Sequence, residues 1–320
     1  MDLRGAIRGI EHFGNDLESK MQIAYGVDRN FIRPMGISMT SILEYNPDAQ
    51  FHVFLDNISD ADRERIRKTV EKYQTSCTLY YVDPRILKAF PVRGTWSVAV
   101  YFRFFTAEAL YGKYARLLYV DADVLCTGDI SPLFSFDMEG NAIAAVSDPS
   151  FADLVDKKKH MQRIGSKGID YFNAGIILID LERWHEEDIS NKAIQLLTEE
   201  PERWKIAQDQ DVLNVLTAGQ VYWLDDGYNY RATFADSYDE HVKLVHYSGS
   251  PKPWTEFYFS QADVSPFEKV RQDSQWKNIP LQAPKTAREN RFMSKKCLFQ
   301  KKYYSFILWQ LRYIWGNGER

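Results

Sequence analysis

The 320-residue chain predicts an α/β protein built on a mainly parallel β-sheet with helices on both faces. The first observation is that short apolar runs rich in strand formers alternate with longer segments of helical periodicity. The second is composition: 45% of the residues are apolar and 26% are charged, which is ordinary for a globular protein with a sizeable core. A repeated β-α-β-α order favours parallel strands joined by helical crossovers.

The predicted elements follow one another from residue 21. Strands are expected at 21–27, 50–56, 78–83 and 116–121, with helices at 31–45, 60–73 and 97–112 between them. Further apolar segments occupy 142–148, 172–181, 221–226 and 243–249, and helices are expected near 190–199 and from the QDQDVLN segment onward. Residues 260–291 are polar and contain prolines, which predicts a connector into a basic tail. We therefore divide the chain into an N-terminal extension (1–20), a main domain (21–259) and a C-terminal module (260–320).

Charge and cysteine usage restrict the compartment and the partners. The three cysteines lie far apart with no CxxC pair, which suits a reducing compartment. The N-terminus has no signal-peptide core and no stretch is apolar enough to span a bilayer, so we expect a cytoplasmic protein. The net charge is −4, and no nucleic-acid partner is expected. Residues 285–320 hold nine Lys or Arg and two Glu, a net charge of about +7 that indicates an anionic partner.

The segment RLLYVDADVLC places two carboxylates, Asp121 and Asp123, at the end of a predicted buried strand. Residues two apart on an extended chain point the same way, so the two charges repel unless a cation lies between them. This pattern indicates a divalent metal site. The alternative is a strand end at which both acids are simply hydrated.

A second group of polar residues lies in HYSGSPKPW. His246 is a ligand-type imidazole, Gly249 lets a phosphate approach the backbone, and Lys252 supplies a positive charge. Taken alone, the segment is better explained as a turn with a surface lysine. Together with Asp121 and Asp123, His246 would complete a metal site whose nitrogen ligand favours Mn²⁺ over Mg²⁺.

Three further segments carry polar groups in apolar surroundings. Asn173 begins the apolar segment YFNAGIILIDL, where it can bind sugar hydroxyls or cap its own turn. Asp209 and Gln210 lie at the start of a predicted helix, with more polar groups than capping needs. Arg103 lies in an apolar helical stretch and must find an anion, either in a binding site or in a structural ion pair.

Taken together, LLYVDADVLCTGDI, YFNAGIILIDL, DQDVLN and HYSGSPKPW resemble the family 8 retaining glycosyltransferases in order and separation. The polar stretch after Trp254 resembles the C-terminal module of the lipopolysaccharide core sugar transferases of that family. The resemblance implies a Rossmann-like GT-A fold and transfer of glucose or galactose from UDP-glucose or UDP-galactose to the lipopolysaccharide core, forming an α linkage. It implies Mn²⁺, with Mg²⁺ as an alternative, on Asp121, Asp123 and His246.

The resemblance also implies roles for the remaining candidate residues. The uridine would lie against Asp28 and Asn30, and the diphosphate against Gly249 and Lys252. The sugar site would be lined by Arg103, Asn173, Asp209 and Gln210. We expect attack on the same face as the departing UDP, with Gln210 beside the anomeric carbon and Asp209 as the second candidate for that role.

Two other functions share some of these sequence features. A metal-dependent phosphatase of the haloacid dehalogenase type also has a DxD motif after an apolar strand, but usually near its N-terminus. A non-catalytic membrane-associated scaffold would not need the metal and donor motifs. The basic aromatic tail, folded as one helix over 295–315, would lie in the interface of an anionic membrane. The resemblance to lipopolysaccharide core transferases implies that this is the inner face of the bacterial inner membrane. The alternative is a helix packed on the domain core.

Overall fold

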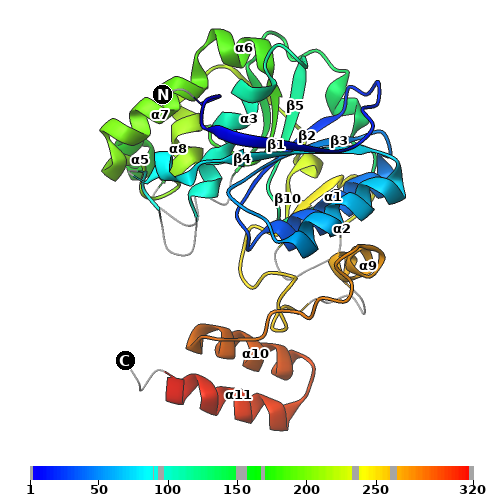
Figure 1. Cartoon of the computed structure of the whole chain (residues 1–320). Helices are drawn as coiled ribbons and strands as arrows, with labels where there is room; N and C mark the ends of the chain where they lie inside the picture. The colour runs from blue at the N-terminus through cyan, green and yellow to red at the C-terminus, as the bar shows by residue number, and fades with distance from the viewer. Residues whose placement is uncertain are drawn as a thin grey trace.

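The computed structural model describes residues 3–88, 90–92, 97–148, 157–166, 170–232, 238–259 and 265–316. An α/β body contains most of the chain, and a pair of helices projects from it at the C-terminal end (Figure 1). The alternation of strands and helices predicted between residues 21 and 120 is confirmed by the structure.

A large mixed β-sheet forms the centre of the body. Over the described residues its strand order is β1-β4-β3-β2-β5-β8-β7-β9. The strands are β1 (Ile7–Gly14), β2 (Gln22–Val27), β3 (Gln50–Leu55), β4 (Ser76–Val82), β5 (Arg116–Val120), β7 (Ile143–Ser147), β8 (Phe172–Asp180) and β9 (Val221–Trp223). Strands β4, β3, β2 and β5 are mutually parallel, whereas β8 is antiparallel to both β5 and β7. The predicted mainly parallel sheet is thus confirmed, with one reversed strand inside it.

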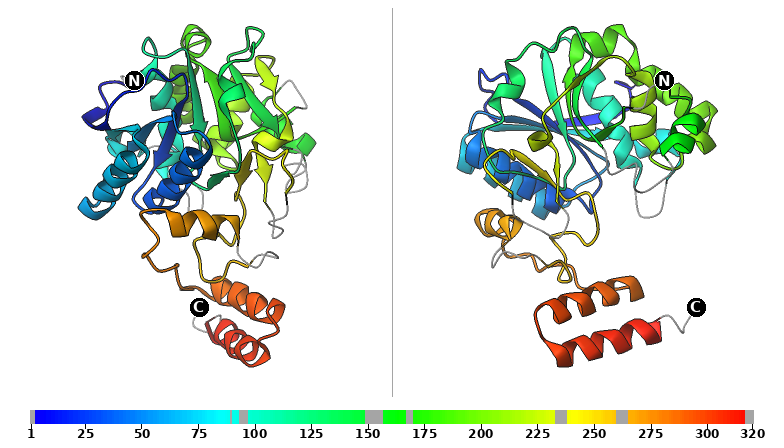
Figure 2. Two further views of the ribbon diagram at one scale, coloured as in Figure 1. Left: turned by 90° about the vertical axis from the view of Figure 1, so that its right-hand side faces the viewer. Right: turned by 180° about the vertical axis from the view of Figure 1, so that it is seen from behind.

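Helices cover both faces of this sheet (Figure 1, Figure 2). Helices α1 (Ile32–Tyr45) and α2 (Asp60–Tyr73) share one core with Ile23 and Tyr25 of β2. The intervening Ala24 faces the other core, to which α3 (Arg103–Leu110), α6 (Leu181–Glu186), α7 (Ile189–Glu199) and α8 (Gln208–Leu216) contribute. Because both faces are buried, β2 is almost continuously apolar rather than alternating.

A small second sheet lies beside the end of β5. Its order is β10-β11-β6, formed by β10 (Tyr230–Arg231), β11 (Leu244–His246) and β6 (Val124–Cys126). The antiparallel pairing of β11 with β6 places His246 opposite Val124. A residue some 120 positions downstream is thereby placed next to the DAD segment.

The remaining helical elements are short or lie outside the main layers. They are η1 (Pro84–Leu87), η2 (Val98–Phe102), η3 (Ser131–Phe134), α5 (Lys157–Ile164), η4 (Pro201–Trp204), η5 (Asp226–Tyr228), α9 (Pro266–Asp273), α10 (Ala287–Phe299) and α11 (Tyr303–Gly316). The single helix predicted over 97–112 is η2 followed by α3. The predicted connector at 260–291 contains α9, which begins at a Ser265 cap with Pro266 in its first turn.

Residues 1–20 include a strand that the sequence did not reveal. Strand β1 pairs antiparallel with β4 and forms an edge of the large sheet. Its side chains alternate between half-buried and exposed, so only one of its faces packs on the protein.

The C-terminal module packs on α1 and α2 through Trp276. This side chain is fully buried, and its Nε1 donates to Asp62 Oδ1 at 3.2 Å. A Cβ atom added to Gly36 of α1 would lie 2.2 Å from the Trp276 ring, so the absence of a side chain at Gly36 makes room for the indole.

The expectation of one helix over 295–315 is wrong. Helix α10 ends at Phe299, Lys301 takes a φ of 57°, and α11 runs back along α10 as a helical hairpin (Figure 2). Lys302 N donates to Cys297 O at 2.8 Å, which closes the end of α10. The large apolar side chains exposed on α11 recur at helical spacing and include Tyr304, Ile307, Leu308, Leu311, Ile314 and Trp315. Among the helices of the described ranges, none has the length and apolar character needed to cross a membrane.

Candidate active site

A pocket of about 410 Å³ opens at the carboxyl ends of β2 and β5. In an open parallel sheet this edge is where ligands bind, because side chains following several strands converge there. Nine of the predicted site residues line the pocket: Asp28, Arg103, Asp121, Asp123, Asn173, Asp209, Gln210, His246 and Lys252. Asn30 and Gly249 are exposed and are not among the lining residues, so their roles in donor binding stay predictions.

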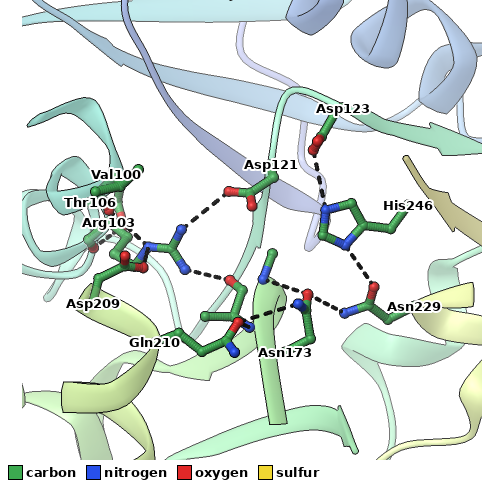
Figure 3. A network of polar contacts seen from close by, with 12 residues as sticks. Val100, Arg103, Thr106, Asp121, Asp123, Asn173, Asp209, Gln210, Asn229 and His246 are labelled. Atoms are coloured by element: carbon green, nitrogen blue, oxygen red, sulfur yellow. Dashed lines mark hydrogen bonds and ion pairs between the residues drawn. The ribbon is translucent and has the colours of Figure 1, made fainter. Parts of the chain in front are cut away.

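The two carboxylates and the imidazole form one cluster. Asp121 and Asp123 flank the turn between β5 and β6, and the ligand atoms of Asp121, Asp123 and His246 all lie within 4.8 Å of one another. His246 Nε2 is 3.3 Å from Asp123 Oδ1 (Figure 3). Two carboxylates and one imidazole are a donor set suited to a divalent cation, so these residues fit the implied metal.

Each of the two carboxylates has a basic partner, but their pKa values shift in opposite directions. Lys252 Nζ donates to Asp123 Oδ2 at 2.6 Å, and Arg103 Nη2 lies 3.2 Å from Asp121 Oδ1. Burial opposes ionisation of Asp123, but Lys252 and His246 outweigh it and hold the pKa of Asp123 below its usual range. Burial raises the pKa of Asp121, an effect that Arg103 offsets only in part.

Arg103 lies at the centre of the pocket wall on the side away from His246. Its side chain is 5% exposed, and it bridges Asp121 and Asp209, with Nε 3.0 Å from Asp209 Oδ2. Its Nη1 donates to Ala174 O at 2.5 Å, and the guanidinium lies over the Tyr119 ring at 4.5 Å. Burial raises the pKa of Asp209 to about 6, against the effect of Arg103. The anionic partner that we expected for Arg103 from the sequence is therefore a pair of pocket carboxylates, Asp121 and Asp209.

Asn173 and Gln210 meet at the floor of the pocket. Gln210 Oε1 accepts from Ala174 N at 3.0 Å and from Asn173 Nδ2 at 3.3 Å. Helix α8 brings Gln210 there because Asn214, one turn further on, accepts from Phe172 N and donates to Phe172 O. The third acid of QDQDVLN, Asp211, is fully buried and turns away from the pocket toward His160 and Tyr171.

Several pocket residues had no local signal in the sequence. Asp148 and Arg231 line the pocket and form an ion pair at 2.5 Å, and Arg231 Nε donates to Ser248 Oγ at 3.0 Å. Asn229 is buried behind His246 and bonds to it. Asp148 and Asn229 lie in connections between elements, and Arg231 lies in the two-residue strand β10, so neither periodicity nor spacing distinguishes them from turn residues.

Comparison with known proteins identifies the family. The model described as "Glycosyl transferase family 8" matches residues 22–257, and the one described as "Glycosyl transferase family 8 C-terminal" matches residues 262–316. The chain belongs to glycosyl transferase family 8. The resemblance seen in the sequence is thus confirmed, and the GT-A fold with it.

Relatives of this family 8 glycosyltransferase have been described in bacteria. It is 32% identical over 294 residues to the lipopolysaccharide glucosyltransferase WaaO of Escherichia coli K12, covering 88% of this chain and 87% of that protein. It is 33% identical over 315 residues to the lipopolysaccharide 1,3-galactosyltransferase of Salmonella typhimurium, covering 92% and 90%.

Solved structures agree with this placement. The galactosyltransferase LgtC, in complex with donor and acceptor sugar analogues, superimposes with a TM-score of 0.69 at 26% identity, covering 80% of this chain and 96% of LgtC. A second LgtC structure, in which an active-site glutamine is replaced by glutamate, gives a TM-score of 0.68 at 25% identity. These matches support glycosyl transfer over the phosphatase and scaffold alternatives.

Proposed function

We propose that this family 8 enzyme transfers a glucosyl or galactosyl group from its UDP-sugar to the core oligosaccharide of lipopolysaccharide, with retention of configuration. The observation that carries the proposal is one pocket in which a metal-type cluster, a lysine and the Asp209–Gln210 pair meet around an empty volume of about 410 Å³. The names of the bacterial relatives support the lipopolysaccharide acceptor, and they include both glucosyl and galactosyl transfer.

Asp121, Asp123 and His246 would hold Mn²⁺, or Mg²⁺ in its place. When bound, the metal would neutralise negative charge that builds up on the departing diphosphate. The imidazole nitrogen favours Mn²⁺, because Mg²⁺ prefers oxygen ligands in octahedral geometry. Lys252 would add its positive charge on the same side, since its Nζ already lies 2.6 Å from Asp123.

The donor would extend from Asp28 across the cluster to Asp209. Asp28 follows β2 at the pocket edge, and Asn30 N donates to Asp28 Oδ1 at 2.8 Å, so the two form one turn for the uridine. Lys252 and Gly249 would hold the diphosphate. The hexose would then lie against a wall built by Arg103, Asn173, Asp209 and Gln210.

Gln210 is our candidate for the group beside the anomeric carbon. The backbone N–H of Ala174 fixes Oε1 as the atom that faces β8, and the amide nitrogen donates to the Tyr171 hydroxyl, so both ends of the Gln210 amide are held at the edge of the pocket. Asp209, the second candidate, is 4% exposed and ion-paired with Arg103, so an attack by its carboxylate would break that pair. This arrangement supports attack on the same face as the departing UDP, with Gln210 orienting the sugar.

The metal assignment is tested by titrating UDP in the calorimeter with and without Mn²⁺. Asp123→Ala should abolish the Mn²⁺-dependent part of UDP binding while leaving the fold intact. The matched control is Asp226→Ala, because Asp225, Asp226 and His241 form a second, exposed group that could hold a metal. The assignment would be wrong if the Asp226 variant lost the metal-dependent binding and the Asp123 variant kept it.

The reaction itself is tested by incubating the protein with Mn²⁺ and each UDP-hexose and measuring released UDP. We expect UDP release with one of the two hexoses, and acceleration by a lipopolysaccharide core acceptor. Release of inorganic phosphate without sugar transfer would contradict the proposal.

We propose in addition that the hairpin of α10 and α11 rests on the anionic inner face of the bacterial inner membrane, where the acceptor is anchored. The exposed fractions of Tyr304, Ile307 and Trp315 are 77%, 55% and 71%, and these residues lie on one stripe of α11. The surrounding segment 285–320 has a net charge of about +7. Aromatic and aliphatic groups beside lysines and arginines are the composition of an interfacial helix.

Truncation after Pro284 tests this docking surface. The shortened protein should keep slow UDP-sugar hydrolysis but no longer sediment with phosphatidylglycerol-containing vesicles, whereas the full chain should sediment in low salt. A matched full-length variant, Ile307→Ser with Leu311→Ser, should lose sedimentation without losing hydrolysis. A truncated protein that sediments as well as the full chain, or that unfolds, would show that the hairpin is structural.

A further inference from the structure

A chain of hydrogen bonds runs beneath the pocket from the metal-type cluster to Gln210 (Figure 3). His246 Nδ1 lies 3.0 Å from Asn229 Oδ1, and Asn229 Nδ2 donates to Asn173 Oδ1 at 3.1 Å. Asn173 Nδ2 then donates to Gln210 Oε1 at 3.3 Å. One continuous network therefore joins His246 to Gln210, the residue proposed to act at the sugar.

The direction of every bond in this network is fixed at strand β8. Gly175 N donates to Asn173 Oδ1 at 3.0 Å, and Ala174 N donates to Gln210 Oε1 at 3.0 Å. A backbone N–H can only donate, so the atoms that face it must be the carbonyl oxygens of the two amides. The usual ambiguity between the oxygen and the nitrogen of an amide is thereby removed for Asn173 and Gln210.

The orientation of the Asn229 amide determines which nitrogen of His246 carries a hydrogen. Because Asn173 Oδ1 is an acceptor, the Asn229 atom that faces it must be the amide nitrogen. The Asn229 oxygen then faces His246 Nδ1, and that nitrogen must carry a hydrogen to bond with it. The other ring nitrogen, Nε2, is turned to Asp123.

We propose that Asn229 is a positioning residue that keeps the hydrogen of His246 on Nδ1 and so presents Nε2 to the divalent cation. The proposal rests on the metal assignment made under the proposed function. A ligating histidine needs a partner on its second nitrogen to fix its tautomer and the orientation of its ring. Asn229 is 4% exposed and occupies the position directly behind the ring, while Gly175 leaves room for the ring in front.

Asn229 also connects the cluster of Asp121, Asp123 and His246 to the pocket wall proposed to contact the hexose. Its side chain uses its oxygen on His246 and its nitrogen on Asn173, so it spans the two parts of the site. An aspartate at this position would keep an acceptor for His246 but place a second oxygen against Asn173 Oδ1. The two arms of the network can therefore be separated by substitution.

The tautomer is tested first, without metal. In protein labelled with ¹⁵N-histidine, long-range ¹H–¹⁵N spectra at about pH 8 should show a hydrogen on Nδ1 of His246. The signal is assigned by its loss in His246→Gln. Asn229→Leu should shift His246 toward a mixture of tautomers. A wild-type spectrum with no hydrogen on Nδ1 would overturn the proposal whatever the metal does.

Metal binding is tested next, by calorimetric titration of Mn²⁺ in the absence of donor. Asn229→Leu should weaken Mn²⁺ binding by about 10- to 100-fold, the usual effect of removing such a partner. Asn229→Asp should bind Mn²⁺ at least as tightly as the wild type but lose kcat, because only its bond to Asn173 is broken. This second variant keeps the test valid if the leucine variant does not fold.

The outcomes distinguish this inference from the proposed function. If the wild type bound no Mn²⁺ or Mg²⁺, the metal assignment would fail and the role of Asn229 would fail with it. If the wild type bound Mn²⁺ and Asn229→Leu bound it equally tightly, only the role of Asn229 would be overturned.

Discussion

Replacing Gly175 of β8 by alanine adds a single methyl group in the most crowded part of the site. A Cβ added there would lie 2.3 Å from His246 Cε1, 2.9 Å from Asp121 Oδ2 and 3.0 Å from Asn173 Oδ1. The φ of Gly175 is not positive, so alanine fits the backbone and only the space is lacking. Gly175→Ala therefore tests the packing of the cluster on β8 without a change in local chain conformation.

The magnitude follows from these distances. Two carbons pack at about 3.5–4.0 Å, so the His246 ring must move by roughly 1.2 Å or more. A metal site holds its ligand distances to about 0.2 Å, so a shift of this size should remove His246 from the site. We expect Mn²⁺ affinity to fall at least about tenfold. Overpacking of a buried position should also lower the free energy of unfolding by about 1–3 kcal/mol.

The assay is Mn²⁺ titration calorimetry together with urea unfolding. The matched control is Gly9→Ala in β1, where the nearest atom to an added Cβ is Tyr81 Cδ2 at an ordinary 3.6 Å. That variant should bind Mn²⁺ like the wild type and change stability by less than about 1 kcal/mol. Wild-type Mn²⁺ affinity in Gly175→Ala would refute the close packing of the cluster on β8.

Three further predictions concern chemistry, pH and domain packing. Gln210→Ala should lower kcat far more than it raises the donor KM, and a pure KM effect in steady-state kinetics would reduce Gln210 to donor positioning. Burial lowers the pKa of His52 to about 3, so the native state keeps it neutral while the unfolded chain takes up a proton below about pH 6.5. Stability should therefore be complete above that pH and fall by about 2 kcal/mol between pH 7 and pH 5; this loss should be absent from urea unfolding of His52→Gln, and an equal loss in both proteins would contradict it. Gly36→Ala should destabilise the protein by about 1–3 kcal/mol despite the better helix propensity of alanine, because its Cβ would meet the Trp276 ring. A gain in stability measured by urea unfolding would show that the indole moves aside freely.

The sequence was sufficient where structure is decided locally. The strands and helices from β2 to β5 were predicted within a few residues, because hydrophobic periodicity reports which face of each element is buried. The DAD segment was expected at the end of a buried strand, and it lies there. Both results depend only on neighbours along the chain, and the family resemblance then indicated which distant motifs belong with that segment.

The sequence did not determine which segments pair, or in which direction. Strand β8 is as apolar as a parallel core strand, yet it runs antiparallel between β5 and β7. Edge strand β1 was missed because a half-exposed strand has a weak apolar signal. Side-chain periodicity fixes the face of a strand, whereas its partner is chosen by backbone hydrogen bonds to distant residues.

In the site too, residue types were visible in the sequence, whereas their positions relative to one another depend on the tertiary structure. His246 was a candidate from its type and its motif, but only the pairing of β11 with β6 places it 3.3 Å from Asp123. Asn229 was not a candidate at all, because an asparagine between a short helical turn and a short strand looks like any turn residue. Its place behind His246 depends on how β10, β11 and β8 pack together.

In the C-terminal tail, the sequence indicated helical residues but not where one helix ends and the next begins. Its basic and aromatic composition was visible in the sequence, and its helical periodicity continued without an obvious stop from 295 to 315. The structure breaks it at Lys301 and folds α11 back along α10. Periodicity predicted that these residues are helical, but contacts between the two helices decided where one ends, because those contacts bury side chains that a single straight helix would leave in water.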